Sequence, residues 1–114
     1  MTCCGSTAAS CRPRGGPDTC VIVAHDATTG AELWRTRLVP APGEPGDETW
    51  GGVPFEERVH VGSWVVPSYA PELDLVYVGT SVTSPKFMLG GVDLKHLYHN
   101  STLALDGETG EIRW

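Results

Sequence analysis

VAHDATTGAELW occupies residues 23–34 of the chain, and a second version of it, LALDGETGEIRW, occupies residues 103–114. The offset from Trp34 to Trp114 is 80 residues, and identical residues occur at five aligned positions: Ala24/Ala104, Asp26/Asp106, Thr29/Thr109, Gly30/Gly110 and Trp34/Trp114. Repetition at a fixed offset is the signature of an array of similar structural units. The repeat is therefore stronger evidence for the fold class than the local propensities of single residues.

Each copy is predicted to form a β-hairpin. An alternating apolar strand leads into Asp-x-x-Thr-Gly, in which the Asp side chain can bond its own downstream backbone and Gly supplies a positive φ. A second strand then ends on Trp. A large indole at that point can dock into the next structural unit while its N–H bonds a backbone group there.

A further hairpin is predicted between the two copies. Residues 61–69 are strand-like, residues 71–74 form a turn, and residues 75–80 form an apolar strand. Residues 39–58 and 81–100 are interrupted by Gly and Pro and are predicted to be long connections. Four short antiparallel strands from one Trp to the next are typical of a β-propeller blade. We therefore predict an all-β fold made of antiparallel four-stranded blades of a β-propeller.

The predicted propeller covers residues 21–114, which hold the end of one blade plus one further blade. Repeat units need neighbours to cover their apolar faces, so a chain of 114 residues is predicted to be a fragment that lacks its neighbouring blades. Residues 1–20 show no periodicity and are predicted to be a disordered or non-homologous leader. The leader holds all four cysteines, whose spacing matches no usual zinc pattern: Cys3, Cys4, Cys11 and Cys20.

Composition excludes some partners. The net charge is −6 and the eight Lys and Arg residues form no basic stripe, so nucleic-acid binding is not predicted. No apolar run approaches the roughly 18 residues of a membrane helix, and no signal peptide is expected in this chain.

Other polar residues give little indication of chemistry. The histidines at 60, 96 and 99 lack paired spacing and are predicted to be exposed or hydrogen-bonded. The acidic pairs at 47–48 and 56–57 are predicted to be solvated loop charges.

The pattern Ala-x-Asp-x-x-Thr-Gly-x-x-x-Trp resembles the tryptophan-docking motif of the eight-bladed quinoprotein alcohol dehydrogenases, which use pyrroloquinoline quinone (PQQ) and a calcium ion. Both copies fit this pattern. Residues 42–50, 62–64 and 69–80 also look like this family, so the resemblance covers about residues 20–114.

The resemblance implies roles for three residues. A Trp before the Tyr-x-Pro turn forms the floor on which PQQ stacks in the family, and this position corresponds to Trp64. Gly62 and Ser63 fall where the family places small residues that touch the cofactor. The cofactor-binding residues expected from the resemblance are therefore Trp64, Ser63 and Gly62.

The calcium ligands and the catalytic base do not carry over. The calcium-binding Asn of the family falls at Val82, which has no oxygen to offer, and the calcium-binding Glu is due near residues 12–15, where none occurs. The family's catalytic Asp would follow Trp114. No catalytic or metal-binding residue is therefore predicted in this chain.

The resemblance implies an oxidoreductase of the bacterial periplasm, which oxidises a primary alcohol with hydride transfer to PQQ and passes electrons to an acceptor. The chain alone is predicted to be inactive. A second interpretation is a non-catalytic PQQ-like β-propeller that acts as a scaffold or assembly factor. The Val at position 82 and the missing Glu favour the scaffold, whereas Trp64 and the match over residues 42–80 favour the dehydrogenase.

Overall fold

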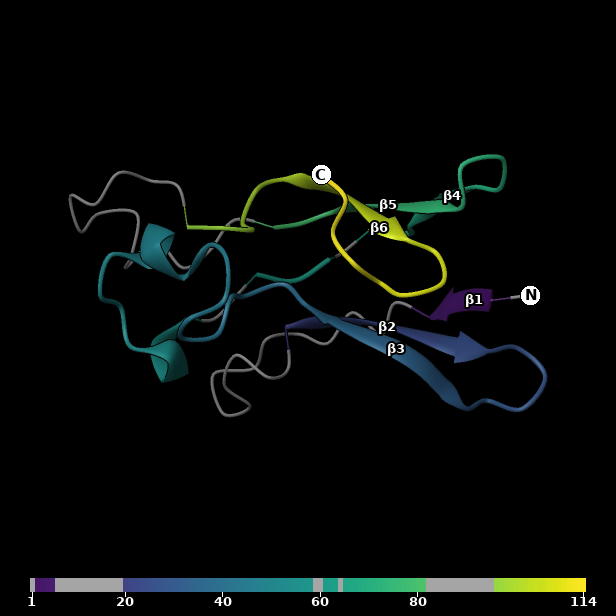
Figure 1. Cartoon of the computed structure of the whole chain (residues 1–114), viewed down its shortest axis with the longest axis horizontal. Coiled ribbons are helices and arrows are strands. Elements are labelled where there is room, and N and C mark those ends of the chain that lie inside the picture. The colour runs from purple at the N-terminus through teal and green to yellow at the C-terminus, as the bar shows by residue number, and fades with distance from the viewer. Residues whose placement is uncertain (1, 6–19, 59–60, 64, 82–95) are drawn as a thin grey trace.

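Two antiparallel sheets of three strands form the framework (Figure 1). The computed structural model describes residues 2–5, 20–58, 61–63, 65–81 and 96–114, with only the backbone described for residues 2–5. The first sheet has the order β1-β2-β3, with bounds Thr2–Gly5, Val21–Asp26 and Glu32–Arg37. The second has the order β4-β5-β6, with bounds Ser68–Ala70, Leu75–Gly79 and Thr102–Asp106.

The second sheet also begins a fourth strand, because Leu105 bridges to Ile112 beyond the last turn. The predicted all-β, antiparallel architecture is confirmed, and the described residues contain only two short 3₁₀ helices, Asp47–Trp50 and Phe55–Glu57. The strand predicted over residues 61–69 is shorter than expected. Only Ser68–Ala70 pairs with β5, directly after Pro67, which has no N–H to donate to a ladder.

Within residues 1–20, which were predicted to be a disordered or non-homologous leader, residues 2–5 form strand β1, and residues 6–19 lie outside the described residues. Strand β1 pairs with β2, from Thr2 opposite Asp26 to Gly5 opposite Val23. The reason is that β2 is buried along most of its length, so both of its edges need hydrogen-bond partners. Cys20, directly before β2, is buried and disulfide-bonded.

The two Asp-x-x-Thr-Gly turns have the same hydrogen bonds. Oδ1 of Asp26 accepts from the N–H groups of residues 28 and 29, and Oδ1 of Asp106 accepts from those of residues 108 and 109. These backbone donors lower the pKa of both carboxyl groups. Gly30 and Gly110 close the turns with φ of 76° and 74°. The predicted turn chemistry is confirmed in both copies.

Trp34 joins the two sheets. Its indole N–H donates to the carbonyl of Gly107 at 3.0 Å, and its side chain is buried. The next inward-facing residue of β3, Thr36, donates its hydroxyl to the carbonyl of Gly110 at 2.5 Å. In Figure 1 the yellow segment after β6 extends toward β3, where these contacts form. Strand β3 of the first sheet therefore contacts the turn that follows β6 in the second sheet.

Both sheets and the loop after β3 share one apolar core, which contains Cys20, Ile22, Ala24, Trp34, Leu38, Val39, Trp50, Val61, Val76, Val78, Leu103 and Leu105. The loop contributes Trp50, whose indole N–H donates to the carbonyl of Leu97 at 2.6 Å. Residues that were predicted to form a simple connection therefore belong to the core.

Arg58 holds this loop together. Its buried guanidinium pairs with Asp47 at 2.6 Å and donates to the carbonyls of Val53 and Pro40, each at 3.0 Å. The N–H of Gly43 and the Arg58 guanidinium lower the pKa of Asp47. Asp47 is thus an ion-pair partner, whereas the sequence predicted a solvated charge. The difference arises because the buried Arg58 guanidinium, which has donors left after its two carbonyl bonds, is balanced by the Asp47 carboxylate.

His96 also differs from its prediction. The sequence suggested an exposed or hydrogen-bonded side chain, but the ring is fully buried, and neither ring nitrogen has a hydrogen-bond partner among the described residues. It packs edge-on against Trp50 at 5.1 Å between ring centroids, and His99 lies 5.5 Å away. Burial, and secondarily the neighbouring His99, lower the pKa of His96. The buried ring therefore favours the neutral form.

A pair of glycine substitutions tests the Trp34 contact. A Cβ at Gly110 would collide with the indole of Trp34, whereas one at Gly30 would meet nothing within 4 Å. Because both residues have positive φ, Gly30→Ala should lower the free energy of unfolding by about 1 kcal/mol through backbone strain. Gly110→Ala should cost about 1–3 kcal/mol more through overpacking. Urea denaturation followed by circular dichroism measures both values, and equal losses would contradict the contact.

His96 should make stability depend on pH. Its pKa is lowered in the folded state, so the unfolded chain binds more protons once the pH falls below the unfolded value of about 6.5. We therefore expect the free energy of unfolding to decrease from pH 7 to pH 5. His96→Leu should flatten this part of the profile. The same slope in the His96→Leu variant would refute the assignment.

Candidate functional site

Gly62, the first of the predicted cofactor residues, is fixed beside the end of β5. Its N–H donates to the hydroxyl of Ser81 at 3.0 Å, and its carbonyl accepts from the N–H of Ser81 at 2.7 Å. The preceding residue, Val61, is fully buried in the core. Both backbone groups of Gly62 are therefore engaged within the protein.

Ser63 is buried, and its hydroxyl donates to the carbonyl of Val65 at 3.3 Å. Trp64, the predicted stacking residue, lies outside the described residues. After it, Val65 and Val66 are 58% and 90% exposed. Gly62 and Ser63 thus lie beside the end of β5. Hydrogen bonds to Ser81 fix Gly62, and the Ser63 hydroxyl bonds the carbonyl of Val65. The exposed apolar side chains of Val65 and Val66 follow.

Thr80 and Ser81 complete this corner, although sequence reasoning gave them no role. The Thr80 hydroxyl donates to the carbonyl of Tyr98 at 2.5 Å and accepts from the N–H of Ser101 at 2.9 Å. The sequence feature that could have identified Thr80 and Ser81 is that two hydroxyl residues come directly after an apolar strand. They connect the segment at 61–63 to the start of β6.

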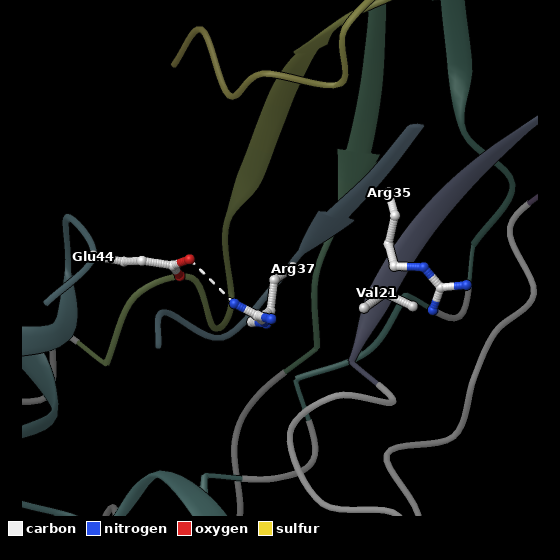
Figure 2. Close-up of a pocket in the computed structure, with 4 residues that line it drawn as sticks. All are labelled: Val21, Arg35, Arg37 and Glu44. Carbon is white, nitrogen blue, oxygen red and sulfur yellow. Dashed lines mark hydrogen bonds and ion pairs between the residues drawn. The ribbon is translucent and has the colours of Figure 1, made fainter. Parts of the chain in front are cut away.

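A cavity of about 400 Å³ lies next to the first sheet, lined by Val21, Arg35, Arg37 and Glu44 (Figure 2). Figure 2 shows the Arg37 guanidinium directed at the Glu44 carboxylate, and their ion pair measures 3.1 Å. Arg35 pairs with Glu32 at 2.8 Å. The hydrogen bond from Arg35 lowers the pKa of Glu32. Each guanidinium thus has its own carboxylate, which leaves the cavity without strong attraction for an anion.

A second cavity, of about 500 Å³, lies between β3 and residues 109–112. Tyr98 lines it, and burial raises the pKa of this phenol, with Glu44 and Glu48 adding to the effect. Neither Gly62 nor Ser63 is among the residues that line the two cavities. The predicted cofactor residues and the cavities are therefore separate features.

Metal ligands are not grouped in the described part of the chain, where no set of three His, Cys, Asp or Glu side chains could hold an ion. Val82 and residues 12–15, which correspond to calcium ligands in the resemblance, lie outside the described residues. Within the same described ranges, no helix is long and apolar enough to cross a membrane.

The sequence matches the family described as glucose/ethanol/alcohol dehydrogenase, beta-propeller domain, over residues 4–114. This range includes most of the segment predicted to be a non-homologous leader. The quinohemoprotein alcohol dehydrogenase ADH IIB of Pseudomonas putida is 36% identical over 107 residues, which cover 82% of this chain and 15% of that protein. The quinoprotein glucose dehydrogenase of Escherichia coli is 31% identical and matches 82% of this chain.

Solved structures give the same relationship. The quinohemoprotein alcohol dehydrogenase ADHIIG of Pseudomonas putida superposes with a TM-score of 0.70 and 32% identity, over 82% of this chain and 16% of that one. The enzyme from Comamonas testosteroni superposes with a TM-score of 0.65. This chain therefore spans about one sixth of the length of these relatives. On the match over residues 4–114, it belongs to the β-propeller domain family of the PQQ-dependent glucose, ethanol and alcohol dehydrogenases.

Proposed function

We propose that the chain is part of a PQQ-dependent alcohol dehydrogenase that oxidises a primary alcohol. The observation that carries this proposal is the combination of the family match over residues 4–114 with 36% identity to an alcohol dehydrogenase. Glucose dehydrogenases also match. An alcohol is proposed as the substrate because both solved structures named above are alcohol dehydrogenases.

The proposed contribution of this chain is an aromatic face for the cofactor, supplied by Trp64. A planar quinone gains dispersion and stacking energy on an indole. Support comes from the residues around position 64: the two bonds between Gly62 and Ser81 and the bond from Ser63 to Val65 fix the neighbouring backbone. Gly and Ser are also small enough to leave room for a flat ligand. In this proposal Gly62 and Ser63 lie against the cofactor and hold the Trp64 backbone in place.

Bound PQQ would supply the two-electron redox chemistry that protein side chains lack. Oxidation of a primary alcohol to an aldehyde removes a hydride from carbon and a proton from oxygen. Bound PQQ would be the acceptor of the hydride, and the proton would need a base. No residue of this chain is assigned as that base, so the chain positions the cofactor and the remainder of the enzyme carries out proton transfer. Calcium in such an enzyme would likewise be held outside this chain.

We further propose a periplasmic location and an external electron acceptor for the whole enzyme. The disulfide at Cys20 supports this location, because disulfides persist in oxidising compartments such as the bacterial periplasm. The names of the quinohemoprotein relatives indicate a haem group in those proteins. A haem group is therefore proposed as the class of electron acceptor for the parent enzyme here.

The Trp64 role can be tested in a chimera that carries residues 20–114 in place of the matching segment of the Pseudomonas putida ADH IIB enzyme. Trp64→Ala should weaken PQQ binding about tenfold, which corresponds to the loss of about 1.4 kcal/mol of stacking energy. Trp64→Phe should retain part of the affinity because it keeps an aromatic face. Fluorescence titration of the calcium-loaded apoprotein measures the dissociation constants.

Val66→Ala is the matched control, since Val66 is the neighbouring exposed apolar residue and has no proposed contact with the cofactor. It should leave PQQ affinity unchanged. Equal affinity of the Trp64→Ala and unsubstituted chimeras would refute the stacking role.

The isolated chain should not catalyse alcohol oxidation. Supplied with PQQ, calcium and ethanol, it should reduce a dye acceptor no faster than PQQ and calcium alone, because it contributes no assigned base. The rate of dye bleaching checks this expectation. A rate that rises in proportion to chain concentration would contradict it.

A further inference from the structure

His96 is a buried ionisable residue that has no part in the proposed chemistry. The chain encloses its ring completely, and the ring packs against the indole of Trp50 at 5.1 Å between ring centroids. Neither ring nitrogen has a hydrogen-bond partner among the described residues. A protonated ring would place two N–H donors and a full charge in this site without water. Protonation therefore favours a conformation in which the His96 ring leaves the site.

The backbone next to His96 is attached to the same residues that its ring contacts. The N–H of Leu97 donates to the hydroxyl of Thr49 at 3.0 Å, and the carbonyl of Leu97 accepts from the indole N–H of Trp50 at 2.6 Å. The ring thus packs on the residue that anchors its own backbone. Movement of the ring away from Trp50 would therefore disturb both bonds of Leu97.

The other end of the turn at residues 96–100 is bonded to the cofactor residues predicted above. The N–H of Asn100 donates to the carbonyl of Ser81 at 2.9 Å, and Ser81 bonds both backbone groups of Gly62. Asn100 has a φ of 47°, which residues other than glycine seldom adopt, so contacts hold the turn in this conformation. Hydrogen bonds therefore connect the position of His96 to that of Gly62.

The charged groups around His96 do not stabilise a proton on its ring. The ring of His99 lies 5.5 Å away, and it adds to the effect of burial in lowering the pKa of His96. On the first 3₁₀ helix, which packs against the ring, Asp47 pairs with Arg58 and Glu48 accepts from a backbone N–H. Both carboxylates of that helix are thus engaged by other groups.

We propose that His96 is a positioning residue for the segment at residues 62–64, and that its neutral ring keeps the turn at residues 96–100 closed on Ser81. When the ring takes up a proton, the turn opens, Gly62 loses its fixed partner, and the affinity for PQQ falls. This inference rests on the proposed cofactor role of residues 62–64.

The direction of the pH effect follows from the burial of the ring. The closed turn lowers the pKa of His96, so the open turn binds more protons once the pH falls below the ordinary value of about 6.5. Opening of the turn is therefore favoured as the pH falls from 7 to 5.

Amide hydrogen exchange, followed by NMR in the chain without cofactor, tests the coupling. Protection factors at the N–H groups of Asn100, Ser81 and Gly62 should fall about tenfold from pH 7 to pH 5. The N–H of Gly110, which is bonded within its own turn, should keep its protection. If the first three groups are protected as strongly as the N–H of the buried Leu38 at every pH, they exchange only by global unfolding and the proposal is overturned.

Substitutions assign the effect to one ring. His96→Leu keeps an apolar side chain in the site but cannot take up a proton, so the fall in protection should disappear. His96→Met is a second replacement with a side chain that adapts to the same space. His99→Gln is the matched control, and most of the fall should remain, because burial is the larger cause of the lowered pKa of His96. The same fall in the His96→Leu and His96→Met chains would contradict the assignment.

The cofactor is tested in the ADH IIB chimera described above, by titration with PQQ at pH 7 and pH 5. The dissociation constant should rise about threefold more in the unsubstituted chimera than in its His96→Leu variant. Equal changes in both would overturn the positioning role. Unchanged PQQ affinity after Trp64→Ala would instead refute the proposed function, and the exchange data would still decide whether His96 controls the turn.

Discussion

The Trp34 indole, docked on the turn of the second hairpin, is the contact on which the arrangement of the two sheets depends. It joins residues 73 positions apart in sequence, so forming it costs the closure entropy of a long loop. Burial of an indole together with a hydrogen bond of 3.0 Å offsets this cost, and removal of a buried Trp from a core costs about 3–5 kcal/mol. Gly110 is required at its position because no side chain fits beneath the ring. The identity of one glycine is thus set by a tryptophan on the other sheet.

Sequence reasoning succeeded where structure is set by local chemistry. Asp26, Gly30 and their counterparts form their turns from bonds within five residues, and those bonds can be read from residue types alone. Sequence reasoning failed where the structure of a residue depends on residues that are distant in the sequence. Strand β1 exists because β2 offers a second edge, and Arg58 is buried because carbonyls from residues 40 and 53 surround it. His96 gave no sign of burial because its neighbour Trp50 lies 46 positions earlier in the sequence.

The same distinction applies to the candidate site. The resemblance predicted that Gly62, Ser63 and Trp64 contact a cofactor, but it did not indicate what fixes the backbone at Gly62. That function belongs to Ser81, 19 positions away from Gly62, which bonds Gly62 through both its hydroxyl and its N–H. The site and the Trp34 contact share one core, since Val61 precedes Gly62 and packs in the same cluster as Trp34. A loss of the inter-sheet contact would therefore disturb the core in which Val61, next to Gly62, is packed.

The repeated turns and the segment proposed to face a cofactor lie in different places in the structure. The Asp-x-x-Thr-Gly turns come after β2 and β6, whereas the segment at 61–63 bonds to residue 81, beyond the carboxyl end of β5. Because β5 and β6 are antiparallel, these features lie at opposite ends of the second sheet. The repeated turn chemistry and the segment proposed to face a cofactor are therefore built from different loops, and loops are where binding residues are most often placed on a rigid sheet.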